Sequence, residues 1–366
     1  MTTNIEEKQI QLRQDTTTNL QNIVAIEGEP VYDKTKKKMG IGDGTSAFSN
    51  IPLLARDDEV EPSIALVNKT WGGRDYNTLL SSESGSTIYE KIYNRAYAGN
   101  YKGLALGDYF DLALPAITIT NGTTTYSIPA KTHRMRAIGY DVYRGCGWSI
   151  PANNGANVAG HRISFMSDDT IGCNIPWQTV NNNNGTSDHK VAWLQSVIYA
   201  CLNGVNNVSA NSYSGDTLGF DASSGGVLQS MPEALRNVIP VKSAYMGNRY
   251  SNSQTLTACT GGADVWGLGK LWLPSEFEFY GQIIHSAEKA SDGKDYNNYG
   301  HIAQYPFFAG HHNTNNHKKK SAVFWLLSSC GGSSSMACLV GTTGDANALT
   351  CPHSGVSVPL CFDIGV

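Results

Sequence analysis

The sequence has few charged residues and no long apolar run. Charged side chains make up 16% of the 366 residues, and the formal net charge is −4. A chain with this balance has no general attraction for a polyanion, so we expect no nucleic-acid partner. No window approaches the roughly 20 apolar residues that a membrane-spanning helix needs, and residues 1–15 contain no apolar signal-peptide core. We therefore expect a protein that is made in a cytoplasm and does not insert into a membrane.

Paired cysteines and metal-binding motifs are also missing. The eight cysteines form no CxxC pair, so we expect free thiols in a reducing compartment and no structural zinc site. The His-rich stretch from His311 to His317 has no Cys or carboxylate at ligand spacing, which favours a solvated loop. No acid–base or nucleophile–base set is readable either. We expect no metal, no cofactor and no enzymatic activity.

Glycine, serine, threonine and asparagine are abundant instead. The chain has 38 glycines, and this composition favours short strands joined by many turns over long helices. Its length exceeds the ~100–200 residues of one typical domain. The sequence therefore predicts an α+β protein, which we divide into residues 1–56, 57–100 and 101–366.

Residues 1–56 contain a predicted β-hairpin. Pro30 to Tyr32 and Lys38 to Gly42 form its strands around the turn from Asp33 to Lys37, and Gly42 to Gly44 form a second turn. An isolated hairpin is marginally stable in water, so we expect neighbouring copies or a larger particle to stabilise it.

Four short stretches of this segment resemble the N-terminal module of bacteriophage tail fibres. They are Leu12-Arg13, Glu27 to Pro30, Ile41 to Gly44 and Ile51 to Leu53. The resemblance implies a virion-attached homotrimer in which this β-rich module binds phage tail or baseplate proteins.

Residues 57–100 are interpreted as a linker or neck with one short helix. Thr87 to Glu90 form a capping box, and Ile88, Ile92 and Ala96 share one face of the helix. This apolar stripe could pack against symmetry mates or against the following domain, and the sequence does not choose between the two.

Residues 101–366 are predicted to form one large domain of strands and three helices. Strands are expected at residues 107–114, 123–128, 135–143 and 161–166. Helices are expected at 191–203 with Asp188 as cap, from Ser230, and from Ser275 through residue 290. Long polar loops are expected at 181–185 and 251–264. The tryptophans are expected to be core anchors, although Trp177 borders a polar loop and could contact a ligand.

An ordered series of four blocks resembles the formylglycine-generating-enzyme type of C-type-lectin fold. The blocks are LWLPSEFEFYG (271–281), YPFFAG (305–310), FWLLSS (324–329) and GVSVPLCF (355–362). This fold occurs in phage receptor-binding proteins of the major tropism determinant type, and the resemblance extends over residues 101–366. Leu327 and Ser357-Val358 stand where many relatives carry arginines, and the calcium-dependent sugar-binding triplets are absent. The polar pairs of those arginines and calcium-mediated sugar binding are therefore not expected.

The terminal tract from Phe324 to Val366 mixes apolar blocks with small and polar residues. We predict that its apolar blocks are β-core: Phe324, Trp325, Leu326, Cys338, Leu339, Val340, Val356, Leu360, Cys361 and Phe362. The intervening residues are predicted to form an exposed face, which the resemblance implies is rewritten by a diversity-generating retroelement. The candidate ligand-binding residues are Leu327, Ser329, Cys330, Ser335, Ala337, Leu349, Cys351, Pro352 and His353.

These patterns together predict a phage tail-fibre receptor-binding protein. It would attach the virion tail to a bacterial cell-surface receptor, protein or glycan, after assembly in the host cytoplasm. Two alternatives stay open: a structural fibre component without receptor binding, and a bacterial surface binding protein that never enters a virion.

Overall fold

A computed structural model describes most of the chain. It covers residues 13–25, 27–35, 38–50, 53–54, 67, 72–121, 124–144, 160–179, 181, 193–194, 196–204, 225–246, 248–249, 264–286, 288–289, 304–309, 320–330, 333 and 335–366. The chain divides into two compact units, residues 1–65 and 66–366. The predicted division into three parts with separate roles stays a prediction.

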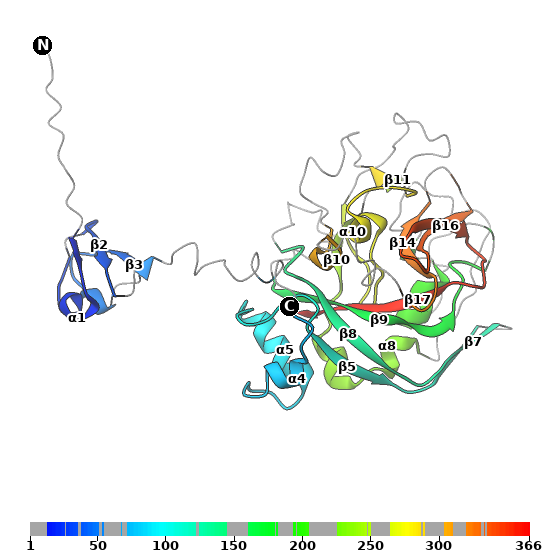
Figure 1. Cartoon of the computed structure of the whole chain (residues 1–366), viewed down its shortest axis with the longest axis horizontal. Coiled ribbons are helices and arrows are strands. Elements are labelled where there is room, and N and C mark those ends of the chain that lie inside the picture. Colours follow the sequence, from blue (N-terminus) through cyan, green and yellow to red (C-terminus); the bar gives the residue numbers. More distant parts are fainter. Residues whose placement is uncertain are drawn as a thin grey trace, which may run out of the picture. The chain divides into compact units, whose positions relative to one another are not determined.

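The smaller unit is a four-stranded sheet with its own core. The strands lie in the order β1 (Arg13–Asp15), β2 (Pro30–Asp33), β3 (Lys38–Ile41) and β4 (Leu53–Leu54), and α1 (Thr17–Leu20) and the 3-10 helix η1 (Phe48–Asn50) complete the unit (Figure 1). The predicted hairpin is confirmed, because Pro30 pairs with Ile41 and Asp33 with Lys38. The buried residues are Leu20, Ala25, Val31 and Phe48, with Ile23 packed against them. The hairpin is thus stabilised within its own chain, by a parallel strand and by this small core.

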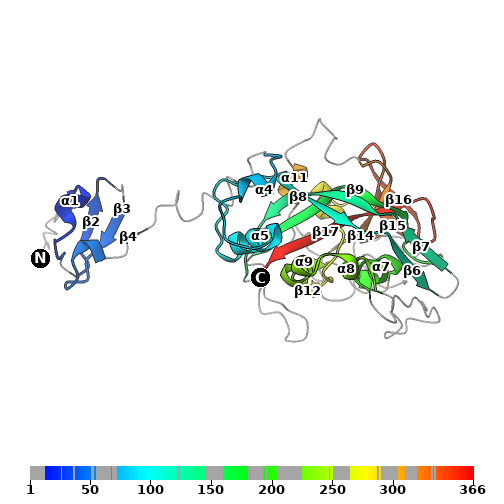
Figure 2. The ribbon, with the colours of Figure 1, turned by 90° about the horizontal axis from the view of Figure 1, so that it is seen from below.

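The larger unit is built on a seven-stranded sheet (Figures 1 and 2). The strand order is β16-β15-β14-β17-β9-β8-β5. The strands are β5 (Tyr109–Leu114), β8 (Lys131–Tyr140), β9 (Arg162–Asn174), β14 (Phe324–Ser329), β15 (Met336–Val340), β16 (Ala346–Thr350) and β17 (Ser357–Gly365). Only the β14–β17 pair is parallel among the neighbouring strands described. All nine residues of β17 are buried, which places this strand in the centre of the core.

Three two-stranded ribbons accompany this sheet. They are β6 (Ile117–Asn121) with β7 (Thr124–Ile128), β10 (Ser243–Met246) with β12 (Asp264–Gly267), and β11 (Asn248–Arg249) with β13 (Glu288–Lys289). The four predicted strands correspond to β5, β7, β8 and β9, whereas β6 was not predicted. Since β6 alternates threonine with isoleucine and pairs along its whole length with β7, the period-two signal was present in ITIT.

Helices pack on both sides of the strands. They are α4 (Tyr76–Leu79), α5 (Ile88–Tyr97), α7 (Val197–Asn203), α8 (Val227–Ser230), α9 (Glu233–Val238), α10 (Glu276–Tyr280) and α11 (Pro306–Ala309). The helix α5 contacts β17 and α9, and α11 contacts β8 (Figure 2). Ile92 and Ala96 are fully buried. The stripe on the predicted neck helix therefore docks onto the domain that follows it.

Two of the predicted helix starts are confirmed. Thr87 caps α5, and Glu90 returns a carboxylate to the Thr87 amide. Ser275 caps α10 in the same reciprocal way, with Glu278 accepting from its amide at 2.6 Å. Both helices thus begin where the sequence predicted.

The other helix bounds were wrong. The helix α10 ends at Tyr280, because Gly281 adopts a left-handed conformation (φ 74°) that breaks the predicted run to residue 290. Trp193 and Leu194 are helical, within the predicted helix of residues 191–203, but Ser196 interrupts that helix and caps α7, which begins at Val197 and stops at Gly204 as expected. Ser230 ends α8, and α9 begins after Pro232 without a side-chain cap.

Tryptophans anchor the core, as predicted. Trp177, Trp193, Trp272 and Trp325 are fully buried. Trp177 packs against Trp193 and Trp325 with ring centroids 6.1 and 6.2 Å apart, so its alternative role as a ligand contact is not supported. The side chains of Trp148 and Trp266 lie outside the described residues, as do the predicted loops apart from Asn181 and the backbone of Asp264.

Within the described part of the chain, no helix is both long and apolar enough to cross a membrane. The same residues contain no group of three or more His, Cys, Asp or Glu side chains that could hold a metal ion. The stretch from His311 to His317 lies outside the described residues.

Candidate functional site

The terminal tract folds into one edge of the large sheet. The antiparallel strands β14, β15 and β16 follow one another, and a turn after Thr350 leads back to β17 in the centre. All ten residues predicted as its β-core are buried. The prediction that this segment carries a rigid core is therefore confirmed.

Four of the nine candidate ligand-binding residues are accessible and close together. Pro352 and His353 are exposed, and Ser335 and Leu349 are half-buried. The Cys351 amide donates to the Ser335 carbonyl at 2.8 Å, which brings the turn after β16 against the residues that precede β15. We call Ser335, Leu349, Pro352 and His353 the edge face. Their receptor-binding role stays a prediction.

The other five candidates are buried, so their predicted exposure was wrong. They are Leu327, Ser329, Cys330, Ala337 and Cys351. The cause is visible at β14, which the preceding segment covers: the Leu327 amide donates to the Pro274 carbonyl at 2.9 Å. All six residues of β14 are buried, and a strand covered on both faces does not alternate between core and solvent.

A buried carboxylate organises the loop beside this edge. Glu276, at the start of α10, is fully buried. Its carboxylate accepts from the amides of Ile284, His285 and Ser286 at 2.8–2.9 Å and from the Ser286 hydroxyl at 2.8 Å. Several donors on one carboxylate fix its position and orientation. The loop after α10 is thereby fixed to the helix.

The same loop contacts the terminal tract. The Cys330 thiol lies 3.4 Å from the His285 carbonyl, and the Glu276 amide donates to Ser328 Oγ at 3.0 Å. Tyr280, the last residue of α10, donates to the Gly344 carbonyl between β15 and β16. Sequence analysis missed this loop because residues 281–290 were assigned to a continuing helix. Gly281, placed after a five-residue amphipathic turn, was the signal that could have found it.

A buried ion pair supports the other side of α10. Lys242 Nζ lies 2.6 Å from Glu278 Oε1 and 3.7 Å from the centre of the Trp272 ring. Tyr143 also donates to Glu278 Oε1, and the Trp272 ring stacks on Tyr305. An ion pair that is surrounded by aromatic rings, and whose carboxylate accepts further hydrogen bonds from Tyr143 and from the Ser275 amide, serves a structural role.

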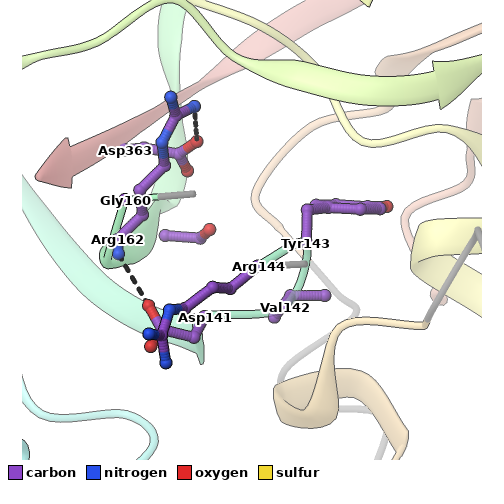
Figure 3. A pocket seen from close by; sticks show the side chains of 8 residues that line it. Asp141, Val142, Tyr143, Arg144, Gly160, Arg162 and Asp363 are labelled. Carbon is purple, nitrogen blue, oxygen red and sulfur yellow. Dashed lines mark hydrogen bonds and ion pairs between the residues drawn. The ribbon is translucent and has the colours of Figure 1, made fainter. Parts of the chain in front are cut away.

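A small pocket lies at the end of β17, near the chain terminus (Figure 3). It is partly open to solvent, lies between the segment 141–144 and β9, and has a volume of about 10 Å³, roughly the space for one water molecule. Asp141 has a positive φ of 51° and accepts from the Arg162 amide at 2.7 Å. Arg162 Nη1 lies 3.9 Å from Asp363 Oδ2, and its Nε donates to the Val366 carbonyl at 2.8 Å.

The chemistry of this pocket indicates an anchor for the chain terminus. Burial raises the pKa of the Asp363 carboxyl, against the opposing effect of the Arg162 charge. The Asp141 carboxylate is already engaged by Tyr101 and His161 at 2.7 and 2.5 Å. No nucleophile is paired with a base among the pocket residues, so the geometry does not point to catalysis.

One part of the chain matches a known protein family. Residues 10–46 match the major tropism determinant N-terminal domain. No curated protein and no solved structure matches the chain. The larger unit is a mixed structure with more strands than helices, and its assignment to a C-type-lectin subtype stays a prediction. The matched module supports a phage tail protein of the major tropism determinant type.

Proposed function

We propose that the protein is a receptor-binding protein of a phage tail, which attaches the virion to a bacterial surface. The observation that carries this proposal is the match of residues 10–46 to the major tropism determinant N-terminal domain. The matched residues lie in the compact smaller unit, which has its own buried core. In this proposal the smaller unit binds tail or baseplate proteins and the larger unit binds the host.

The larger unit offers a rigid support for a binding surface. Its edge face comprises Ser335 just before β15, Leu349 on β16, and Pro352 and His353 in the turn that follows β16. Loops and edges on a rigid sheet can change sequence at little cost to the fold. We propose a C-type-lectin-like head whose edge face, Ser335, Leu349, Pro352 and His353, contacts the receptor and is diversified by a retroelement.

We also propose that the protein is a homotrimer, because three weak sites on one particle bind a cell surface far more strongly than one. The buried stripe on α5 does not serve this assembly, so the proposal now rests on the tail module alone. Light scattering should give about three times the chain mass of 39.5 kDa. A mass of 39.5 kDa at micromolar concentration would contradict the trimer.

Competition for adsorption tests the proposed function. Purified full-length protein is added to host cells before a phage that carries the same tail protein, and unadsorbed phage are counted. A receptor-binding protein should reduce adsorption in proportion to its concentration. If adsorption stays unchanged even though the added protein is folded and antibodies against it label the virion tail by immunogold, the result would favour a structural fibre component instead.

A further inference from the structure

We propose that His353 presents a fixed hydrogen-bond donor, its Nε2–H group, to an acceptor oxygen of the receptor, and that Gly355 is the positioning residue that directs this donor. The inference rests on the proposed function, because His353 belongs to the edge face. It adds the chemical group that the face recognises and a residue outside the face that controls it.

The turn that carries His353 is tied to the rest of the large unit. The His353 amide donates to the Thr350 carbonyl at 3.0 Å, which closes a turn directly after β16. Within this turn, the Cys351 amide donates to the Ser335 carbonyl at 2.8 Å, and the Cys351 carbonyl accepts from the Gln178 amide at 3.2 Å. Cys351 is itself fully buried. The backbone beneath the His353 ring is therefore held in place, although the side chain is exposed.

One ring nitrogen of His353 is occupied, and this decides which nitrogen carries the proton. The Gly355 amide donates to His353 Nδ1 at 3.1 Å. A ring nitrogen that accepts a hydrogen bond carries no proton, so the proton of the neutral imidazole lies on Nε2. Within the described part of the chain, no second hydrogen bond to this ring is seen. The Nε2–H group is thus available to a partner.

Gly355 also positions the ring by leaving space for it. A Cβ at residue 355 would lie 2.9 Å from His353 Cε1 and 3.3 Å from His353 Nδ1. These separations are shorter than the 3.5–4.0 Å or so at which carbon atoms pack best, so a side chain there would displace the ring. The ring is the free end of an exposed side chain, so this displacement should cost the fold little. Gly355→Ala therefore moves the donor without removing it.

The composition of the edge face makes this donor important for specificity. Leu349 and Pro352 are apolar, and Pro352 precedes His353 in the chain. A receptor that covers the edge face removes water from around the ring. An N–H group that loses water without gaining an acceptor costs binding free energy. A receptor with an oxygen opposite Nε2 is therefore favoured over one without it.

Substitutions at residue 353 separate the donor from the ring. Fluorescent full-length protein is titrated onto intact cells of a bacterial strain, chosen from a panel because wild-type protein stains it. His353→Gln places an amide N–H near the position of Nε2, so half-saturation should stay within about threefold of wild type. His353→Asn ends near the position of Nδ1, and His353→Phe keeps a ring without a donor. Each should raise the half-saturating concentration about tenfold or more.

Gly355→Ala tests the positioning role. It should raise the half-saturating concentration about tenfold, like His353→Asn, while its melting temperature matches that of wild type. Tyr97→Ser is the control, because Tyr97 is 64% exposed on α5, at the other end of the large unit from β16 in both views (Figures 1 and 2). This control should stain like wild type.

The tautomer of His353 is measured without any receptor. Full-length protein with nitrogen-15 in its histidine rings gives two-bond proton–nitrogen correlation spectra at neutral pH, and the signals missing from His353→Gln belong to His353. Wild type should show the Nε2–H tautomer. Gly355→Ala should show a mixture of both tautomers, because its ring is displaced from the residue 355 amide.

Several results would overturn the inference. These are an Nδ1–H tautomer in wild type, wild-type staining by His353→Phe or His353→Asn, and a loss with His353→Gln as large as that with His353→Asn. Periodate and proteinase treatment of the cells distinguish a glycan oxygen from a protein oxygen, and staining that survives both would also count against the receptor acceptor. If wild-type protein stains no strain, the proposed function fails and takes the receptor role of His353 with it, whereas the spectra still decide the tautomer.

Discussion

The strands β17 and β16 belong to the same sheet but differ in how much of each is buried. Every residue of β17 is buried, and the strand lies between β14 and β9. The strand β16 contains one buried residue, Ala348, and has β15 as its one neighbour among the described strands. A central strand must pair with a neighbour on both edges and pack on both faces, whereas an edge strand pairs with a neighbour on one edge. The difference indicates where the sequence can change without loss of the fold.

The largest effect on stability is expected from truncating a large side chain in the buried centre of the sheet. Trp325 is fully buried, and its indole donates to the Ile175 carbonyl at 2.8 Å. Trp325→Ala should reduce the free energy of unfolding by about 3–5 kcal/mol, the usual range for a large buried aromatic. Urea unfolding measures it, with Asn347→Ala on β16 as an exposed control. A loss below about 1 kcal/mol would show that the tract is not core.

A smaller effect should appear on acidification. His133 is buried on β8, and neither ring nitrogen has a hydrogen-bond partner among the described residues. Burial, assisted by the charge of Lys131, lowers the pKa of His133 to about 4. The unfolded chain therefore binds more protons between pH 6.5 and 4, and stability falls as the pH drops through this window.

The size of this loss is about 2 kcal/mol at pH 4.5. It is measured by comparing urea unfolding of wild type and His133→Leu at pH 7.5 and pH 4.5. The variant should lose less stability than wild type over that interval. Equal losses in the two proteins would mean that His133 is protonated in the folded state.

A third effect, of about 1 kcal/mol, tests the helix that covers β14. Ser275 caps α10, so Ser275→Ala should cost that much stability. Ser230 provides the matched control, because it stands in a similar sequence pattern but caps no helix. The Ser230 hydroxyl donates to the Val227 carbonyl at 2.7 Å, so Ser230→Ala should lose that hydrogen bond alone and cost less stability than Ser275→Ala. Equal costs at both positions would remove the distinction between them.

Local signals in the sequence predicted the parts of the fold that short-range chemistry decides. The capping boxes at Thr87 and Ser275 each need two residues three apart, and both formed. The start of α7 at Val197 was not predicted: Ser196 caps it, and the predicted cap Asp188 lies outside the described residues.

The candidate site was predicted less well, because exposure depends on what covers a strand. Ser329 and Cys351 are small or polar and were read as surface, but both are buried. No local pattern shows that the Pro274 carbonyl pairs with the Leu327 amide of β14. Gly281 marked the start of the loop after α10, but the hydrogen bonds of Glu276 to that loop could not be predicted, since they join residues eight to ten positions apart.

The most direct test of the account measures stability and adsorption together on the edge face. Single variants Ser335→Ala, Leu349→Ser, Pro352→Ala and His353→Ala should each change the free energy of unfolding by less than about 0.5 kcal/mol. Host-cell adsorption should fall strongly for at least one of them, because interface energy concentrates in few residues. Trp325→Ala, in contrast, should cause a large loss of stability. If the edge-face variants unfold the protein, or if all four adsorb like wild type, the receptor is bound elsewhere and the central claim is contradicted.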